Sequence, residues 1–144
     1  MAPPRLRATP LAAFERDGLK SALKNSGLPH DVETSAGLFW RFETVNDVPV
    51  GFGGLEIHGR SALLCAVVTL PPLRRVGFGS AIVAALEQEA QLHGCRAVYL
   101  VTADEDFFAR RGYSPCKPSA VPATIRSSEQ FAALASAATM VKRM

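Results

Sequence analysis

Cysteine pairs, long apolar runs and a strong net charge are all missing from this sequence of 144 residues. Its three cysteines are Cys65, Cys95 and Cys116, and none of them lies in a C-x-x-C pair. An odd number of scattered thiols argues against a disulfide framework and against a structural zinc site. Scattered thiols are typical of a reducing compartment. We therefore expect a cytoplasmic protein that holds no metal.

Membrane segments and nucleic-acid-binding stretches are missing as well. No apolar run reaches the roughly 18 residues that a membrane-spanning helix needs. The opening stretch "MAPPRLRATP" lacks the apolar segment of a signal peptide. The formal net charge is only +3, and the basic residues form no stripe interleaved with aromatics. We therefore expect neither a membrane nor a nucleic acid among the partners.

Hydrophobic residues make up 48% of the chain, enough for the core of one compact domain spanning residues 1–144. The stretch Arg5–Ala8 predicts a short first strand. Thr9 followed by Pro10 is typical of a helix start with Thr9 as its N-cap. Apolar residues as far as Asn25 supply part of one face, so a helix is predicted to follow the first strand.

The middle of the chain changes from strand-like to helix-like patterns. Aromatic and β-branched residues predict strands over Gly37–Val45 and Val48–Ile57. A continuous apolar run over Ser61–Leu70 predicts a strand buried on both faces. Apolar residues then recur every four positions from Phe78 to Ala90, which is one face of a helix that Gly94 ends.

A second buried strand, Ala97–Val101, follows this helix, so the three elements form a βαβ unit with parallel strands. Further on, the sequence predicts a short helix in "EDFFARR", another around Ser127–Leu134, and a last strand near Ala138–Val141. The predicted fold class is therefore α/β of the α+β type. Its sheet is mixed and mostly antiparallel, with one central parallel βαβ unit.

The segment that joins the buried strand to this helix, "RRVGFG" (Arg74–Gly79), has the composition of an anion-binding loop. Backbone N–H groups from Val76 to Ser80 can converge on a phosphate, and Arg74 or Arg75 would add positive charge. The segment lacks the P-loop pattern, and Ile82 stands where the dinucleotide fingerprint needs its third glycine. A plain glycine loop with two solvated arginines is the alternative.

The stretch "VVTLPPLRRVGFGSAIVAAL" resembles the cofactor-binding segment of the GNAT family of N-acetyltransferases, whose signature is [RQ]-x-x-G-x-[GA]. The strands before it, the βαβ unit and "FFARRGY" after the next strand also match that family's order. The resemblance implies acetyl-CoA as cosubstrate, with its pyrophosphate at the glycine loop and its pantetheine arm between two splayed strands. The residues that it assigns to the cofactor are Val67, Val68, Thr69, Arg74, Arg75, Val76, Gly77, Phe78, Gly79, Ser80, Phe107, Phe108 and Arg111.

The same resemblance implies direct transfer of the acetyl group to an amine in a ternary complex, which requires a base. Glu56 ends a predicted strand at the rim of the sheet, and we expect it to be this catalytic base. His58 is the alternative, and Glu43 and Asp104 are weaker candidates.

Many members of the family carry a tyrosine that protonates the leaving thiolate, and this chain has Phe108 at that position. Tyr113 is expected to pack in the core instead. Protonation can then come from water or from the product ammonium. The missing tyrosine also leaves an alternative function open, a CoA-binding regulatory protein with little turnover.

A narrower resemblance rests on "GGLEIHG", "FFARRGY" and "AVPATIRSSEQFAAL", which are similar to small N-acetyltransferases of bacterial arsenic-resistance operons. It implies a small, amino-acid-like acceptor amine, such as an arsenical or a toxic amino-acid analogue. Arg41 and Arg126 are candidates for binding its carboxylate, because a guanidinium donates two parallel hydrogen bonds. Cys65 stands where that group commonly has an arginine, and it counts as a candidate substrate contact. Whether the chain is a monomer or a homodimer stays open.

Overall fold

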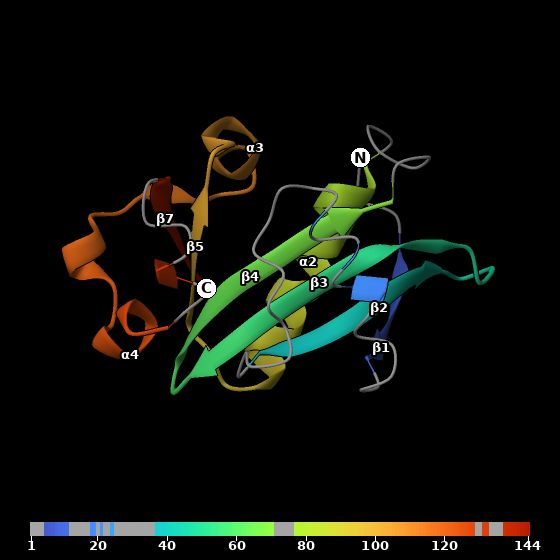
Figure 1. The fold of residues 1–144 in the computed structure, drawn as a ribbon, viewed down its shortest axis with the longest axis horizontal. Helices are drawn as coiled ribbons and strands as arrows, with labels where there is room; N and C mark the ends of the chain where they lie inside the picture. The colour runs from blue at the N-terminus through green and yellow to red at the C-terminus, as the bar shows by residue number, and fades with distance from the viewer. Residues whose placement is uncertain are drawn as a thin grey trace.

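A computed structural model describes residues 5–11, 18–19, 21, 24, 37–70, 77–128, 131–132 and 137–144. In this part of the chain, seven strands form one sheet in the order β1-β2-β3-β4-β5-β7-β6 (Figure 1). The strands are β1 (Leu6–Pro10), β2 (Leu38–Thr44), β3 (Pro49–His58), β4 (Ser61–Thr69), β5 (Ala97–Thr102), β6 (Ser114–Pro115) and β7 (Ala138–Arg143). The helices are α2 (Phe78–Leu92), α3 (Glu105–Ala109) and α4 (Ala123–Arg126), with a 3₁₀ turn at Pro118–Ala120.

The sheet is mixed, as the sequence predicts. Strands β4 and β5 pair in parallel and are joined through α2, whereas the other neighbouring strands pair antiparallel. The predicted central βαβ unit is therefore confirmed, and so is the fold class.

Helix α2 covers one face of the sheet and crosses behind β3 and β4 in Figure 1. Ile82, Leu86 and Ala90 are fully buried against β2, β3 and β4, which confirms the four-residue spacing seen in the sequence. Burial of a leucine or isoleucine side chain stabilises a fold by about 1.5–3 kcal/mol. The helix ends as predicted, because Gly94 adopts the left-handed conformation with φ 82°.

The opposite face of the sheet is covered in two places. Near the start of the chain, Leu19 is fully buried among Phe39, Ala66 and Val68. At the other end, Ile125 of α4 packs with Leu63 and other side chains of β4 and β5. Both faces of β4 are therefore covered, which explains its continuous apolar sequence.

The predicted helix start at Thr9 and Pro10 is wrong, because both residues belong to strand β1. Thr9 pairs with Arg41, Pro10 pairs with Trp40, and the next backbone N–H, that of Leu11, donates to Phe39. Hydrogen bonds alternate along an antiparallel pair, so the nitrogen of Pro10 faces away from β2. Since β1 is an edge strand, the missing N–H of proline breaks no ladder bond there. Of the predicted helix as far as Asn25, residues 18, 19, 21 and 24 are helical and the remainder lies outside the described residues.

The last predicted helix begins differently from the expectation. Helix α4 ends at Arg126, and Ser127 lies in a turn, although Phe131 and Ala132 are helical as predicted. The rest of that stretch lies outside the described residues. The final strand is confirmed as β7, which runs two residues further than the prediction of Ala138–Val141.

Candidate active site

The centre of the sheet opens into a gap between β4 and β5. The two strands pair only from Ser61–Leu63 on β4 to Ala97–Tyr99 on β5, and both strands continue beyond the last pair. A bulge lies at this point, because Gly54 faces Ala66 and Leu55 faces Leu64, which leaves Cys65 as an extra residue on β4. A bulge bends its strand and increases its twist. The extra residue therefore explains why β4 turns away from β5.

Beyond the bulge, the two sides of β4 face different partners. The backbone N–H of Leu70 donates to Val50 of β3 at 2.8 Å, so by the antiparallel alternation Val68 also turns its backbone toward β3. Val67 and Thr69 then turn theirs toward the gap. The side chain of Val68 is buried on the face opposite α2, whereas Val67 packs on the α2 side.

A cavity of about 620 Å³ lies beside the end of β4, between the first turn of α2 and α3, and its size suits a cofactor-sized ligand. Eight of the residues that the sequence assigns to the cofactor line it: Val67, Thr69, Gly77, Gly79, Ser80, Phe107, Phe108 and Arg111. Asp104 and Arg110 complete the lining. Arg110 is not among the residues assigned to the cofactor from the sequence, although its position beside Arg111 in the "RR" doublet could have indicated that it lies near the cofactor.

The first turn of α2 forms one end of the cavity. Gly77 adopts φ 84°, which favours glycine, and the helix begins directly after it. No described side chain caps this end, and the first turn holds no acidic residue. The backbone N–H groups of the first turn therefore carry a partial positive charge that suits an anion. The predicted contacts Arg74, Arg75 and Val76 lie outside the described residues.

Helix α3 forms the opposite wall of the cavity. The side chain of Asp104 caps this helix by accepting a hydrogen bond from the N–H of Phe107 at 3.3 Å. Phe108 is buried and packs edge-on against both Phe107 and Tyr113. The two phenylalanines therefore serve the core and the cavity wall together.

Arg111 links this wall to α2. Its guanidinium lies 3.6 Å above the ring centroid of Phe107 and donates to the Phe107 carbonyl and to the Ser80 hydroxyl. The Nε atom is buried and has no hydrogen-bond partner among the described residues. Burial first, and then the neighbouring Arg110 charge, lower the pKa of Arg111, and Asp104 opposes them. Arg111 therefore brings a positive charge to the cavity and holds α3 close to the first turn of α2.

Glu56 lies on β3 beside the closed end of the gap. Its strand neighbour is Leu63, which belongs to the face opposite α2, so Glu56 is on that face too. The residue is only 4% exposed, and its Oε1 lies 3.0 Å from Nε2 of His58. The structure therefore brings together the expected base and its alternative, although neither lines the cofactor cavity.

Two further polar side chains near this region, those of Cys65 and Tyr113, are buried and have other partners. Burial, and then the Glu56 charge, raise the pKa of the Cys65 thiol, which makes it a poor nucleophile. The Tyr113 hydroxyl donates to Glu87 at 2.9 Å, and Lys142 completes this cluster at 3.1 Å from Glu87. Burial and Glu87 raise the pKa of Tyr113. Tyr113 thus packs in the core as expected, with a hydrogen bond that the sequence did not indicate.

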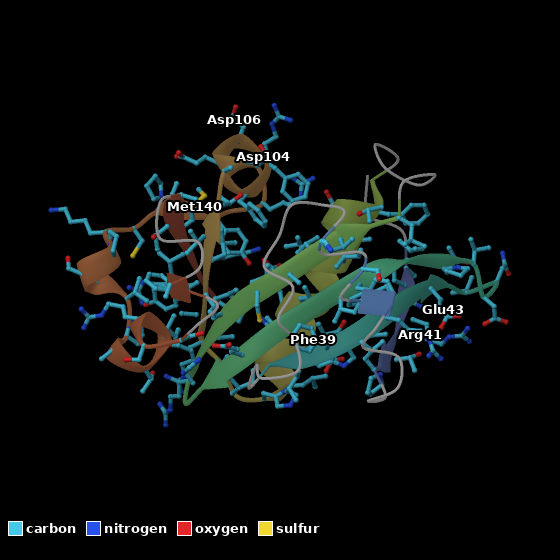
Figure 2. All side chains as sticks on the ribbon, viewed as in Figure 1. Phe39, Arg41, Glu43, Asp104, Asp106 and Met140 are labelled. Carbon is cyan, nitrogen blue, oxygen red and sulfur yellow. The ribbon has the colours of Figure 1, made fainter. Side chains whose placement is uncertain are left out.

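The two arginines expected at the acceptor lie in different surroundings. Arg41 lies on β2, where its Nε donates to Glu43 at 3.0 Å, and Figure 2 shows both on the opposite side of the view from Asp104. Its strand neighbour is Phe52, four residues from Glu56, which is roughly 13 Å along a strand. Arg126 is exposed in the last turn of α4, and this helix covers the same face of the sheet as Glu56.

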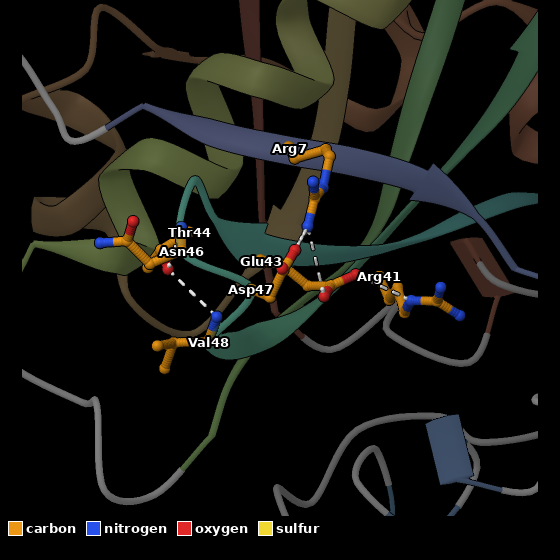
Figure 3. Close-up of polar contacts among 7 residues, drawn as sticks. All are labelled: Arg7, Arg41, Glu43, Thr44, Asn46, Asp47 and Val48. Carbon is orange, nitrogen blue, oxygen red and sulfur yellow. Dashed lines mark hydrogen bonds and ion pairs between the residues drawn. The ribbon is translucent and has the colours of Figure 1, made fainter.

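Figure 3 shows why Glu43 is a weak candidate for the base. It lies 3.8 Å from Arg7 and also pairs with Arg41, so two guanidinium groups engage its carboxylate. Arg7 in addition pairs with Asp47, which has φ 64° in the turn between β2 and β3. The hydroxyl of Thr44 accepts from the N–H of Val48 across the same turn at 3.1 Å. This cluster stabilises a hairpin far from the gap.

The described part of the chain contains neither a cluster of metal ligands nor a membrane-spanning helix. Among the described residues, no three His, Cys, Asp or Glu side chains gather as ligands would. No helix in the described ranges is both long and apolar enough to cross a membrane.

Comparisons with known proteins place this fold. The model of the acetyltransferase (GNAT) family matches residues 8–116. No protein of curated function matches the sequence. Among solved structures, this chain is similar to N-acetylglutamate synthase from Neisseria gonorrhoeae, which is complexed with coenzyme A and N-acetyl-glutamate. The TM-score is 0.77 and the sequence identity is 18%, over 99% of this chain and 35% of that chain.

Two further structures are similar over their whole length. Rv2747 from Mycobacterium tuberculosis, in a complex that contains CoA, has a TM-score of 0.72 and 19% identity over 98% of this chain and 99% of that chain. PaiA N-acetyltransferase from Thermoplasma acidophilum, in complex with coenzyme A, has a TM-score of 0.67 and 12% identity over 100% of both. At such identities the likeness shows the fold alone. The chain spans about a third of the length of the N-acetylglutamate synthase chains that it matches.

The family follows from the match of its model, which covers most of the chain. The chain belongs to the acetyltransferase (GNAT) family, and the resemblance seen in the sequence is confirmed at that level.

Proposed function

We propose that the protein is an acetyl-CoA-dependent N-acetyltransferase that acetylates the amine of a small, amino-acid-like molecule. The observation that carries the proposal is the cavity beside the end of β4, bounded by α3 and by the first turn of α2, where no described side chain caps the helix. Acetyl-CoA has an extended pantetheine arm with a negatively charged diphosphate at its end, so its shape and charge suit this cavity. Family membership and the coenzyme A complexes of similar structures support this cosubstrate.

Three groups would hold acetyl-CoA. The backbone of Val67 and Thr69 faces the gap and would pair with the amide groups of the pantetheine arm, as an added strand pairs with a sheet edge. The N–H groups of Gly79 and Ser80 would bind the pyrophosphate. Arg111 and its neighbour Arg110 would add the positive charge that a diphosphate requires.

Glu56 would act as the base. The bulge at Cys65 ends the gap beside it, which is where the thioester of a bound cofactor would lie. An acceptor on the face opposite α2 would then meet the carboxylate of Glu56 before it meets the thioester. Loss of a proton turns the acceptor's ammonium into a nucleophile, which attacks the thioester carbonyl and releases CoA as its thiol.

An amino-acid-like acceptor is supported by one of the similar structures and by the position of Arg126. N-acetylglutamate synthase, one of the similar structures, is complexed with N-acetyl-glutamate, an N-acetylated amino acid. Arg126 is exposed on a helix that covers the same face as Glu56, and it would bind an acceptor carboxylate. The resemblance to the arsenic-operon enzymes extends this proposal to toxic amino-acid analogues. Cys65 and Arg41 are the less favoured contacts, since one is buried and the other pairs with Glu43.

Three free thiols agree with a cytoplasmic location.

Thiol release from acetyl-CoA, measured with the standard amino acids, spermidine and amino-acid analogues as acceptors, tests the proposal. We expect release with an amino-acid acceptor and none with the same amino acid already acetylated on its amine. Glu56→Gln should lower kcat by about a hundredfold or more, which is the usual contribution of a general base. The loss should be greatest at low pH, where the acceptor is protonated.

Binding of CoA without thiol release for any acceptor would refute the proposal in favour of a CoA-binding regulatory protein. Failure to bind CoA would remove both functions. A Glu56→Gln enzyme with the kcat and pH profile of the wild type would move the base to another residue.

A further inference from the structure

Glu56 and His58 form a hydrogen-bonded pair on one face of β3. The two residues are two positions apart on the strand, so their side chains lie on the same face. Oε1 of Glu56 lies 3.0 Å from Nε2 of His58, with 6% of the Glu56 side chain and 18% of the His58 side chain exposed. The pair therefore joins a buried carboxylate to a partly exposed imidazole ring.

A buried carboxylate needs hydrogen-bond partners to stay ionised, since removal from water disfavours its charge. An imidazole N–H is a strong donor to such an oxygen. His58 is therefore suited to donate to Glu56 and to fix the direction in which the carboxylate faces.

Other titratable groups on this face must also be considered. Cys65 of β4 lies close enough for the Glu56 charge to raise the pKa of its thiol, so the thiol stays neutral. Tyr99 of β5 is buried on the same face beside Leu63. Arg126 of α4 is exposed at its edge. On β2, pairing with β3 ends at Leu38, and the side chains there are apolar.

We propose that His58 is a positioning residue for proton transfer, which acts by donating its Nε2–H to Oε1 of Glu56. This inference rests on the function proposed above. The acceptor's ammonium gives a proton to the Glu56 carboxyl group, so one N–H bond breaks and one O–H bond forms. The amine attacks the thioester carbonyl, the C–S bond breaks, and a second amine proton leaves with CoA as its thiol. Glu56 then returns its proton to water.

Three variants separate this role from a structural one. His58→Gln keeps a side-chain N–H but cannot change its charge, whereas His58→Phe removes the donor. His93→Gln is the matched control, because His93 is exposed at the end of α2 and bonds only to the carbonyl of Glu89 among the contacts described. The readouts are kcat, the pH dependence of kcat/KM and the melting temperature.

We expect His58→Phe to lower kcat by about tenfold or more, the usual effect of losing a hydrogen bond to a charged group. The pH dependence of its kcat/KM should differ from that of the wild type, because the Glu56 carboxylate loses a hydrogen-bond partner. His58→Gln should restore both to within about threefold of the wild type, and His93→Gln should change neither. A His58→Phe enzyme with the wild-type profile would overturn the inference. So would a His58→Gln enzyme as impaired as His58→Phe, because the imidazole itself would then be the base.

A measurement without an acceptor tests the pair itself. The ring resonances of His58, identified by their loss in His58→Gln, are compared by NMR at one pH in the wild type and in Glu56→Gln. Replacement of the carboxylate by a neutral amide should shift these resonances, because the ring loses its charged hydrogen-bond partner. Unchanged resonances in an enzyme that transfers acetyl groups overturn this inference alone. Shifted resonances in a protein that transfers none overturn the proposed function, and the positioning role with it.

Discussion

Replacement of Arg111 by alanine tests how α3 is held against α2 at the wall of the cavity. The arginine donates two hydrogen bonds, to the Ser80 hydroxyl and the Phe107 carbonyl, and its guanidinium lies over the Phe107 ring. Two such bonds stabilise by about 1 kcal/mol each, and a stacked cation adds about 0.5–1 kcal/mol. The buried Nε without a partner costs about 1 kcal/mol in the other direction.

The expected net loss for Arg111→Ala is therefore about 1.5–2 kcal/mol, or about 3–6 °C in melting temperature for a chain of this size. Urea unfolding followed by fluorescence measures it, because Trp40 is the single tryptophan and is buried. The KM for acetyl-CoA should rise in the same variant, since a charge at the cavity is lost.

Arg111→Lys is the matched control, because it keeps the charge and loses the planar fork. It should lose most of the stability while its KM for acetyl-CoA rises less than that of the alanine variant. Unfolding of Arg111→Ala within about 0.5 kcal/mol of the wild type would refute the reasoning, since the three contacts would then contribute nothing beyond the cost of burying Nε.

Three further predictions use the same stability and kinetic measurements. Gly51→Ala would place a Cβ 1.9 Å from a backbone oxygen of β4, so it should lose more than about 3 kcal/mol, whereas Gly18→Ala, at a helical position, meets no described atom within 4 Å and should melt at or slightly above the wild type. Gly79→Ala meets its nearest neighbour, a ring carbon of α3, at an ordinary 3.4 Å, so stability should hold while the KM for acetyl-CoA rises; an unchanged KM would exclude this turn from the cofactor site. Tyr113→Phe should lose about 1 kcal/mol at pH 7 through the hydrogen bond to Glu87. Burial and Glu87 raise the pKa of the Tyr113 phenol in the folded state. The contribution of Tyr113 to the free energy of unfolding is therefore complete below the pKa of about 10 in the unfolded state, and it falls as the pH rises above that pKa. Urea unfolding at about pH 11 should then show a smaller difference between the wild type and Tyr113→Phe.

The elements that could be predicted from the sequence are those with a strong local pattern. Helix α2 has apolar residues at helical spacing and a glycine at its end, and β4 has a continuous apolar run. Pro10 misled the prediction because a proline after a threonine suits both a helix start and an edge strand. The choice depends on whether a neighbouring strand is present, which is a property of the tertiary fold. Strand β6 has only two residues, Ser114 and Pro115, and is defined by its partner alone.

The cofactor cavity could be anticipated because its parts lie in consecutive segments with recognisable composition. The pairing of Glu56 with His58 was within reach of the sequence too, since alternate residues of a strand share a face. The cluster of Tyr113, Glu87 and Lys142 was not, because its members are separated by 26 and 55 positions along the chain. The bulge at Cys65 was also hidden, because neither a glycine nor a proline marks it.

The extra residue in β4, Cys65, makes this strand respond differently to substitution and to deletion at position 65. The thiol is neutral and buried, so several small apolar side chains would serve at this position. Removal of the residue is different, because Leu64 and Ala66 already face consecutive residues of β3 and would become neighbours in a ladder without a bulge. Residues Ala66 to Thr69 would keep their partners on β3, but β4 would lose the bend that turns it away from β5. Position 65 should therefore accept substitution by other small apolar residues over evolutionary time, but not deletion of the residue.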